Sequence, residues 1–210
     1  MHNSEHRVTG LILHGAMRYD LTVWLFTRGR ERSFREKLLA PLKLSPGEAV
    51  LDIGCGTGGL AIAAKRQVGP AGMVHGIDAS PEMVARAERK ARGAVAFEVA
   101  PAQMLPFPDR QFDAVVSTLM FHHLPRKARV ECACEMRRVL KPGGRALVVD
   151  FAESSEPHRM RLFAHQGRHG HTDLSEIVAY LSDAGLTPGE QGPVGVSSLQ
   201  FALATAPAVA

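Results

Sequence analysis

Cysteine is scarce in this sequence, and its scarcity limits both disulfide and metal chemistry. The 210 residues include three cysteines, Cys55, Cys132 and Cys134. Their spacing does not match a zinc motif, so no metal is expected on them. An odd cysteine count behind a polar first segment that lacks an apolar signal sequence indicates a reduced protein, which we expect in the cytoplasm.

Long apolar runs are also lacking, and the longest falls far short of the ~20 residues that a membrane-spanning helix needs. The chain is mildly basic, with a formal net charge of +4 and a pI of about 9.2. Basic residues crowd positions 28–37, but Glu31 and Glu36 are interleaved with them. This pattern favours a solvated helix face over a nucleic-acid-binding stripe, and it is compatible with weak peripheral contact with an anionic membrane.

Short apolar strands alternate with helical segments along most of the chain. The pattern predicts strands over residues 49–53, 73–77, 95–99, 114–117, 146–150 and 199–204, and helices over 60–67, 81–92, 127–140 and 174–184. Such alternation predicts an α/β protein with a Rossmann-like, doubly wound parallel sheet and helices on both faces. No helix follows the last strand, which is therefore expected to pair antiparallel at the sheet edge.

The N-terminal segment differs from the rest because it is predicted to be helical throughout. Leu21, Trp24 and Leu25 have helical spacing, and the Ser-Pro-Gly sequence at 45–47 then breaks the chain. We expect a single globular domain in which residues 1–45 form a helical lid on a sheet domain at 46–205.

A glycine-rich stretch, DIGCGTGG, follows the first predicted strand at residues 52–59. Glycine accepts positive φ and lets a ligand approach the backbone, and the next helix N-terminus favours an anionic group. Asp52 lies inside the apolar strand, where its carboxylate needs a partner such as the ammonium group of a ligand. Gly54, Gly56 and Gly59 also fit the GxGxxG pattern of dinucleotide-binding proteins, so an NAD(P)-binding oxidoreductase is an alternative.

A second acid, Asp78, ends the second predicted strand. A carboxylate at this position can accept hydrogen bonds from both ribose hydroxyls of an adenosine ligand, whichever cofactor carries it. Asp52 and Asp78 could instead be satisfied by backbone amides of their own turns.

Several stretches, in this order, resemble the motifs of class I S-adenosylmethionine (SAM)-dependent methyltransferases. They are VLDIGCGTG at 50–58, GIDASPEM at 76–83, LPFPD at 105–109, FDAVVS at 112–117 and RVLKPGG at 138–144. The subgroup that the chain most resembles is the quinone-biosynthesis C-methyltransferase type. The resemblance implies a seven-stranded sheet, mostly parallel with an antiparallel edge strand, and SAM as the methyl donor, with S-adenosylhomocysteine as product.

The resemblance also implies roles at matching positions. Asp52 and the glycine turn would hold the methionine part of SAM, and Asp78 would hold the ribose. Other positions would border the adenine ring or lie along the methionine part through their backbone atoms. The implied cofactor-binding set is Asp52, Gly54, Cys55, Gly56, Gly58, Asp78, Ala79, Met83, Ala102, Gln103, Thr118 and Leu119.

The adenine side of this set departs from the family pattern. Ala79 and Met83 would pack on the ring, and Ala102 and Gln103 would border it. Pro101 stands where many relatives carry an aspartate that accepts from the adenine amino group. The Gln103 amide oxygen, a backbone carbonyl or water could accept that hydrogen bond instead.

His122 and His123 follow the fourth predicted strand and are the candidates for a general base, because imidazole titrates near neutrality. Either could simply hydrogen-bond the loop. Tyr19, Trp24 and His169 are the candidates for acceptor contact, although ordinary helix packing explains the two aromatic residues equally well. Histidines around His169 favour a substrate-side or surface loop over a metal site.

The expected function is in-line methyl transfer from SAM to a small-molecule acceptor such as a quinone, a lipid or an aromatic metabolite. Asp52 and the short chain after the fifth strand disfavour the oxidoreductase alternative. A non-catalytic SAM-fold binding protein is a further alternative, suggested by Pro101 and by the lack of a definite base. A nucleic-acid acceptor is not expected, since residues 117–121 lack an Asn-Pro-Pro-aromatic motif. Monomer and homodimer both fit the sequence.

Overall fold

The computed structural model describes residues 16–151, 173–196 and 198–208. The helices are α1 (Ala16–Phe26), α2 (Glu31–Leu39), α3 (Gly59–Val68), α4 (Pro81–Ala91), α5 (Arg126–Val139) and α6 (Leu174–Asp183), with short 3-10 helices η1 (Ala40–Leu42) and η2 (Phe121–His123). The strands are β1 (Ala49–Ile53), β2 (Met73–Asp78), β3 (Ala96–Val99), β4 (Phe112–Thr118), β5 (Leu140–Phe151), β6 (Thr187–Pro193) and β7 (Leu199–Thr205). No helix within these ranges is long and apolar enough to cross a membrane.

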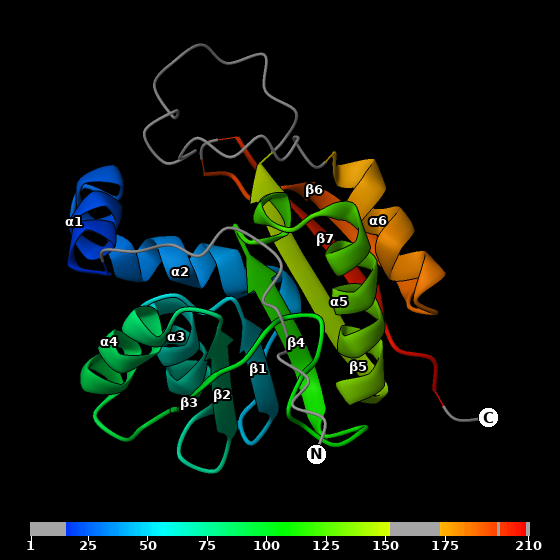
Figure 1. Cartoon of the computed structure of the whole chain (residues 1–210), viewed down its shortest axis with the longest axis horizontal. Coiled ribbons are helices and arrows are strands. Elements are labelled where there is room, and N and C mark those ends of the chain that lie inside the picture. Colours follow the sequence, from blue (N-terminus) through cyan, green and yellow to red (C-terminus); the bar gives the residue numbers. More distant parts are fainter. Residues whose placement is uncertain (1–15, 152–172, 197, 209–210) are drawn as a thin grey trace, which may run out of the picture.

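The strands form one seven-stranded sheet in the order β3-β2-β1-β4-β5-β7-β6 (Figure 1). Strands β3, β2, β1, β4 and β5 pair in parallel, and β7 runs antiparallel to both of its neighbours. The predicted mostly parallel, Rossmann-like sheet with an antiparallel strand near its edge is confirmed. The last strand lies one place inside the edge, however, because β6, which the apolar pattern did not predict, pairs outside it.

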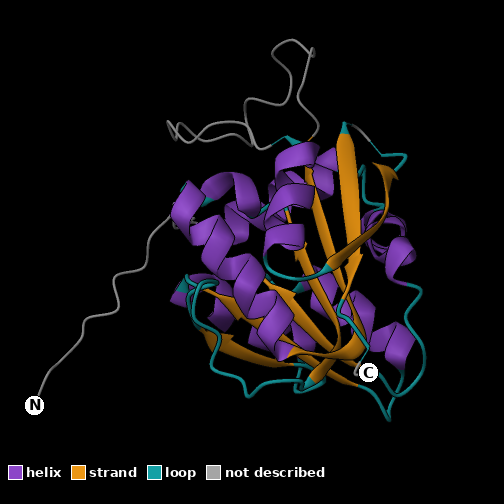
Figure 2. Ribbon diagram, turned by 90° about the vertical axis from the view of Figure 1, so that its right-hand side faces the viewer, coloured by secondary structure: helices purple, strands orange, loops and turns teal. Residues whose placement is uncertain are grey.

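Helices cover both faces of the sheet, as expected (Figure 2). The central strands are apolar on both sides, and alternate residues belong to two separate cores. Leu51 and Val115 pack with α5 and α6 in one core, whereas Val50 and Val116 pack with α2 and α3 in the other. Burial on both faces fixes the register of β1 and β4, and therefore fixes where their carboxyl ends emerge.

Caps of regular chemistry mark where α3 and α4 begin. Ser80 caps α4 by accepting a hydrogen bond from the Met83 amide at 3.4 Å, and Pro81 occupies the first turn. Helix α3 begins after Gly58, whose φ of +75° suits glycine. These caps place the N-termini of α3 and α4 directly after β1 and β2, at the edge of the sheet where open α/β folds bind ligands.

Candidate functional site

The glycine turn after β1 is built by backbone bonds and by close approach of neighbours. The amides of Gly54 and Cys55 both donate to the Ile77 carbonyl, at 2.9 and 2.8 Å, and join the ends of β1 and β2. Gly54 has a φ of +74°, and a Cβ there would lie 2.6 Å from Cγ of Met120. The turn therefore needs glycine both for its backbone angles and for the approach of the loop after β4.

Asp52 is the most unusual residue of this turn. It is 1% exposed, and neither carboxylate oxygen has a hydrogen-bond partner among the described residues. Burial raises the pKa of Asp52 to about 7. The main opposing influence is the Ala61 amide, which is directed at the carboxylate without reaching regular hydrogen-bond geometry; Asp78 adds to the increase and Arg35 opposes it. A buried carboxylate beside this glycine-rich turn fits the cationic amino group of a ligand, as the sequence predicts.

Asp78 is engaged by its own turn. Its Oδ2 accepts from the Gly56 amide at 2.8 Å, and its Oδ1 accepts from the Ser80 amide at 2.9 Å. Burial raises its pKa, although these two bonds lower it. The turn alternative considered for Asp78 is thus present, but each oxygen has a second lone pair with which to accept from a hydroxyl.

The remaining candidates for cofactor binding differ in burial and in the groups they could present to a ligand. Burial raises the pKa of the Cys55 thiol well above its usual value, so the thiol is not a reactive thiolate. Cys55 would therefore contact a ligand through its backbone groups. Met83 is 1% exposed, and Ala79, Ala102 and Gln103 are partly buried. Roles on the adenine stay predictions for these residues.

Beyond β4, the chain turns sharply and presents two histidines. Leu119 has a φ of +56°, and its amide donates to the Val149 carbonyl at 2.8 Å, so the backbone beyond Thr118 stays joined to β5. Helix η2 follows and carries His122 and His123, whose ring centroids lie 3.9 Å apart.

His122 is held by Asp150 at the end of β5. His122 Nδ1 lies 2.7 Å from Asp150 Oδ1, and the His122 amide donates to Oδ2 at 3.1 Å. Asp150 is 2% exposed and also accepts from the Phe151 amide at 2.9 Å. A buried carboxylate on Nδ1 fixes the ring and its tautomer, which leaves Nε2 as the nitrogen that can exchange a proton. This arrangement can serve a general base.

Helix α1 lies across the glycine turn and is held there by polar contacts. The Tyr19 ring is the nearest side chain to Gly56, about 4 Å from where a Cβ would lie, and burial raises the pKa of Tyr19 to about 12. Asp20 accepts from Thr57 Oγ1 at 2.6 Å, from Arg86 Nε at 2.9 Å and from Lys90 Nζ at 2.9 Å. Burial favours protonation of Asp20, but these bonds hold its pKa below the usual range. One carboxylate thus ties α1 to the turn and to α4.

Replacing Asp20 with asparagine should loosen α1 from the turn. We expect backbone amides of residues 16–26 to exchange at least ten times faster and the affinity for S-adenosylhomocysteine to fall about tenfold, consistent with the 1.5–3 kcal/mol typical of charged hydrogen bonds. Hydrogen exchange and calorimetry measure the two effects. Asp183→Asn, at an exposed position in α6, is the control and should change neither. Unchanged exchange in α1 would contradict this role of Asp20.

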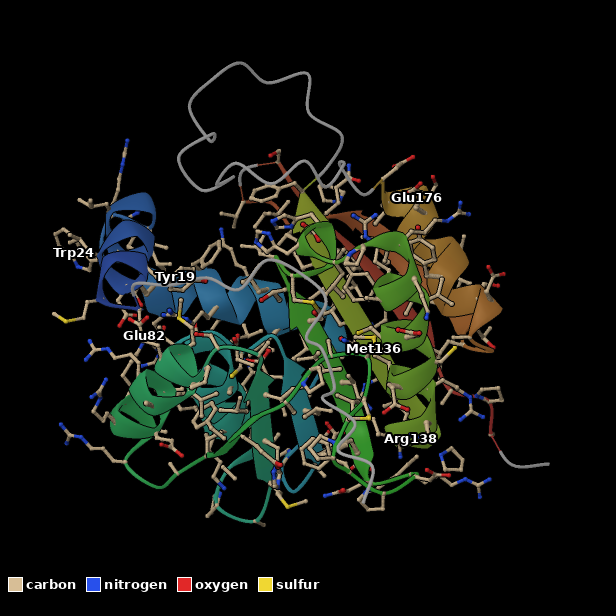
Figure 3. The ribbon with its side chains drawn as sticks, viewed as in Figure 1. Tyr19, Trp24, Glu82, Met136, Arg138 and Glu176 are labelled. Carbon is tan, nitrogen blue, oxygen red and sulfur yellow. The ribbon has the colours of Figure 1, made fainter. Side chains whose placement is uncertain are left out.

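The sequence did not predict the contact between Asp150 and His122 or the ion pairs of Asp20. Asp150 ends an apolar strand as Asp52 does, so the same argument from burial could have found it. The place of Asp20 in the N-terminal helical segment suggests a position in the wall of the acceptor pocket, but its ion pairs could not be predicted, because its partners come from distant elements. Trp24 is 53% exposed and lies on the outer side of α1, away from Tyr19 (Figure 3). His169 lies outside the described residues.

Comparison with known proteins agrees with this geometry. Residues 50–144 match the family model described as "Methyltransferase domain". The chain is 37% identical over 162 residues to a ubiquinone/menaquinone biosynthesis C-methyltransferase UbiE of Geobacter sulfurreducens, and 33% identical over 158 residues to a demethylmenaquinone methyltransferase of Lactobacillus johnsonii. These matches cover 75% and 73% of this chain, but 61% and 64% of the relatives.

A solved structure extends the likeness to most of the fold. A SAM-dependent methyltransferase from Aquifex aeolicus superposes with a TM-score of 0.72 over 92% of this chain and 99% of that chain, at 24% identity. Residues 50–144 therefore carry a methyltransferase domain, and the fold around it is that of SAM-dependent methyltransferases. Within that class its relatives are of the quinone-biosynthesis C-methyltransferase type, and it spans less than two thirds of the length of those named above.

Proposed function

We propose that the protein transfers a methyl group from SAM to a small-molecule acceptor, with a hydroquinone as the leading candidate. The observation that carries the proposal is Asp52, a buried carboxylate without a hydrogen-bond partner among the described residues, beside a turn that only glycine can form. The ammonium group of SAM supplies the missing partner. The hydroquinone acceptor is suggested by the names of the relatives reported above.

Some residues of this chain bind the cofactor, and others transfer a proton. SAM, when bound, supplies a methyl group already activated by a positively charged sulfur. The Asp52 carboxylate and the turn amides hold its amino-acid end, and Asp78 holds the ribose. His122 accepts the hydroxyl proton of the acceptor at Nε2 while Asp150 retains the proton on Nδ1, which makes the neighbouring ring carbon nucleophilic. Once that carbon carries the methyl group in place of the bond from methyl to sulfur, it loses its own hydrogen as a proton, and the hydroxyl and the aromatic ring are restored.

The N-terminal helices are proposed to cover the site. Residues 1–45 act as a lid over the domain at 46–205, and α1 excludes water from the reaction when both ligands are bound. Alignment of acceptor and methyl group can by itself supply up to about 7–11 kcal/mol of the barrier reduction. The protein acts in the cytoplasm, in keeping with free Cys55, Cys132 and Cys134. Its acceptor is not a nucleic acid, and it works as a monomer or a homodimer.

Two measurements test the proposed function. Calorimetry should detect binding of S-adenosylhomocysteine and none of NADH, because Asp52 matches an ammonium group. Radiolabelled SAM, supplied with reduced demethylmenaquinone, should then yield a labelled quinone. Binding without any transfer, also with a lipid extract as acceptor, would favour the non-catalytic SAM-binding alternative. Binding of NADH alone would favour the oxidoreductase alternative.

A further inference from the structure

The outer face of α1 is an apolar stripe that the proposed site does not use. Met17, Leu21, Trp24 and Leu25 recur at helical spacing and are 74%, 57%, 53% and 59% exposed. The opposite face of the helix carries Tyr19 over the glycine turn (Figure 3). Single exposed apolar residues are ordinary, but four on one helix face mark an interaction surface.

A basic groove lies between α2, α3 and α4. Its volume is about 510 Å³. Among the charged residues that line it, one is an acid, Glu31, and the others are Arg32, Arg35, Arg66, Arg89, Lys90 and Arg92. Arg35 pairs with Glu31, and Lys90 pairs with Asp20. Within the described residues no acid pairs with Arg66, Arg89 or Arg92, so the groove carries uncompensated positive charge.

The apolar stripe and the basic groove are neighbours. Lys90 lines the groove and also binds Asp20 of α1 at 2.9 Å, while Arg86, one turn earlier on α4, binds the same carboxylate. Helices α1 to α4 lie together at one end of the molecule (Figure 1). This end therefore presents apolar side chains beside a concentration of arginines.

We propose that this end of the molecule docks on the surface of a phospholipid bilayer that contains anionic lipids. Leucine and tryptophan side chains insert at the level of the headgroups, where tryptophan is favoured, and arginine forks bind phosphate oxygens. A self-complementary contact with a second copy would bring two basic grooves together, which disfavours that occupant. The inference does not depend on methyl transfer, but a docked α1 would hold the glycine turn close to acceptors dissolved in the bilayer.

Trp24 is the one tryptophan of the chain, so its fluorescence reports on this face directly. Vesicles of phosphatidylglycerol and phosphatidylcholine should shift its emission to shorter wavelength and reduce quenching by acrylamide at least threefold. Vesicles of phosphatidylcholine alone should change neither. Because each basic residue near an anionic surface contributes about 1 kcal/mol, 0.5 M salt should release most of the protein.

Variants separate the apolar and electrostatic contributions. Leu21→Gln with Leu25→Gln should lower partitioning into anionic vesicles at least tenfold, since burying each leucine side chain is worth about 1.5–3 kcal/mol. Arg89→Gln with Arg92→Gln should lower it about tenfold to thirtyfold at low salt. Lys127→Gln, on α5 and 88% exposed, is the charge control and should bind like wild type. Unchanged affinity for S-adenosylhomocysteine shows that each variant is folded.

Several results would overturn the proposal. One is equal partitioning into neutral and anionic vesicles, or an Arg89/Arg92 variant that binds as tightly as wild type. Another is a Trp24 already protected from acrylamide without vesicles, which would mean that the chain itself or a second copy covers this face. Binding of pyrophosphate in the groove, with no response of Trp24 to any vesicle, would assign the groove to a soluble phosphate ligand instead.

Discussion

Asp52→Asn should bind S-adenosylhomocysteine about a hundredfold more weakly than wild type. The asparagine has the same shape but no charge, so it loses the attraction to the ammonium group, and charged hydrogen bonds are worth about 1.5–3 kcal/mol. Isothermal calorimetry at pH 8 measures the difference. The change is confined to a residue that is 1% exposed, so a mere surface effect does not explain a loss of this size.

The same substitution should stabilise the protein without ligand. Burial raises the pKa of Asp52 from 3.8 to about 7, so between these values the unfolded chain has released a proton that the folded chain keeps. The contribution of Asp52 to stability is therefore largest below the lower value and falls as pH rises through this window, by an amount on the order of 2–4 kcal/mol. Asp52→Asn should flatten the fall, as urea unfolding at pH 4.5 and pH 7.5 would reveal.

The exposed Asp183 is the control for both measurements. Asp183→Asn should keep wild-type affinity and the wild-type dependence of stability on pH. If Asp52→Asn bound S-adenosylhomocysteine as wild type does, the carboxylate would be a structural residue of the turn and the proposed function would lose its main support. A wild-type apo protein equally stable at both pH values would show that a partner satisfies Asp52 without ligand.

Much of the fold follows from local patterns because the central strands are buried on both faces. Apolar runs such as residues 49–53 and the caps at Ser80 and Gly58 are strong local signals. Strand β6 (Thr187–Pro193) could not be predicted in this way, since TPGEQGP combines two prolines and two glycines that usually mark a turn. It is a strand because β7 offers it an unpaired edge, which is a tertiary effect.

The sequence predicted those parts of the candidate site whose residues all lie in one short segment. Asp52 and the glycines belong to one strand and its turn, so burial and backbone angle could be read together. The Asp150–His122 pair joins β5 to the loop after β4, and the Asp20 cluster joins α1, the glycine turn and α4. To predict such contacts between distant segments, one must know that β4 lies beside β5 and where α1 packs. The periodicity of apolar residues predicts neither.

The acids around the site show how α1 and the turn depend on each other. Asp78 binds the Gly56 amide, Thr57 binds Asp20, and Tyr19 covers the turn between them. A ligand that displaces Tyr19 from Gly56 would leave α1 held by the Asp20 contacts and by the bond from the Ala16 amide to Glu82 at 2.8 Å. The lid is therefore expected to move about its contacts with α4, rather than to detach.

His122→Gln should lower the rate of methyl transfer about a hundredfold to a thousandfold, in the range of general acid–base catalysis. Asp150→Asn should lower it about tenfold to a hundredfold, because Asp150 is a positioning residue that fixes the His122 ring through Nδ1 at 2.7 Å. Single-turnover transfer to reduced demethylmenaquinone measures both rates. The KM for SAM should change little, since neither side chain belongs to the proposed SAM-binding set.

The pH profile distinguishes a base from a structural histidine. The wild-type rate should fall in acid, because a protonated imidazole accepts no proton, and the His122→Gln rate should lack this fall. His123→Gln is the matched control and should keep both the rate within threefold and the wild-type profile. A His122→Gln enzyme with the wild-type rate and profile would assign the Asp150 pair to loop structure and leave alignment alone to promote the transfer. If His123→Gln lost the acid limb instead, the base would be the neighbouring ring, 3.9 Å away.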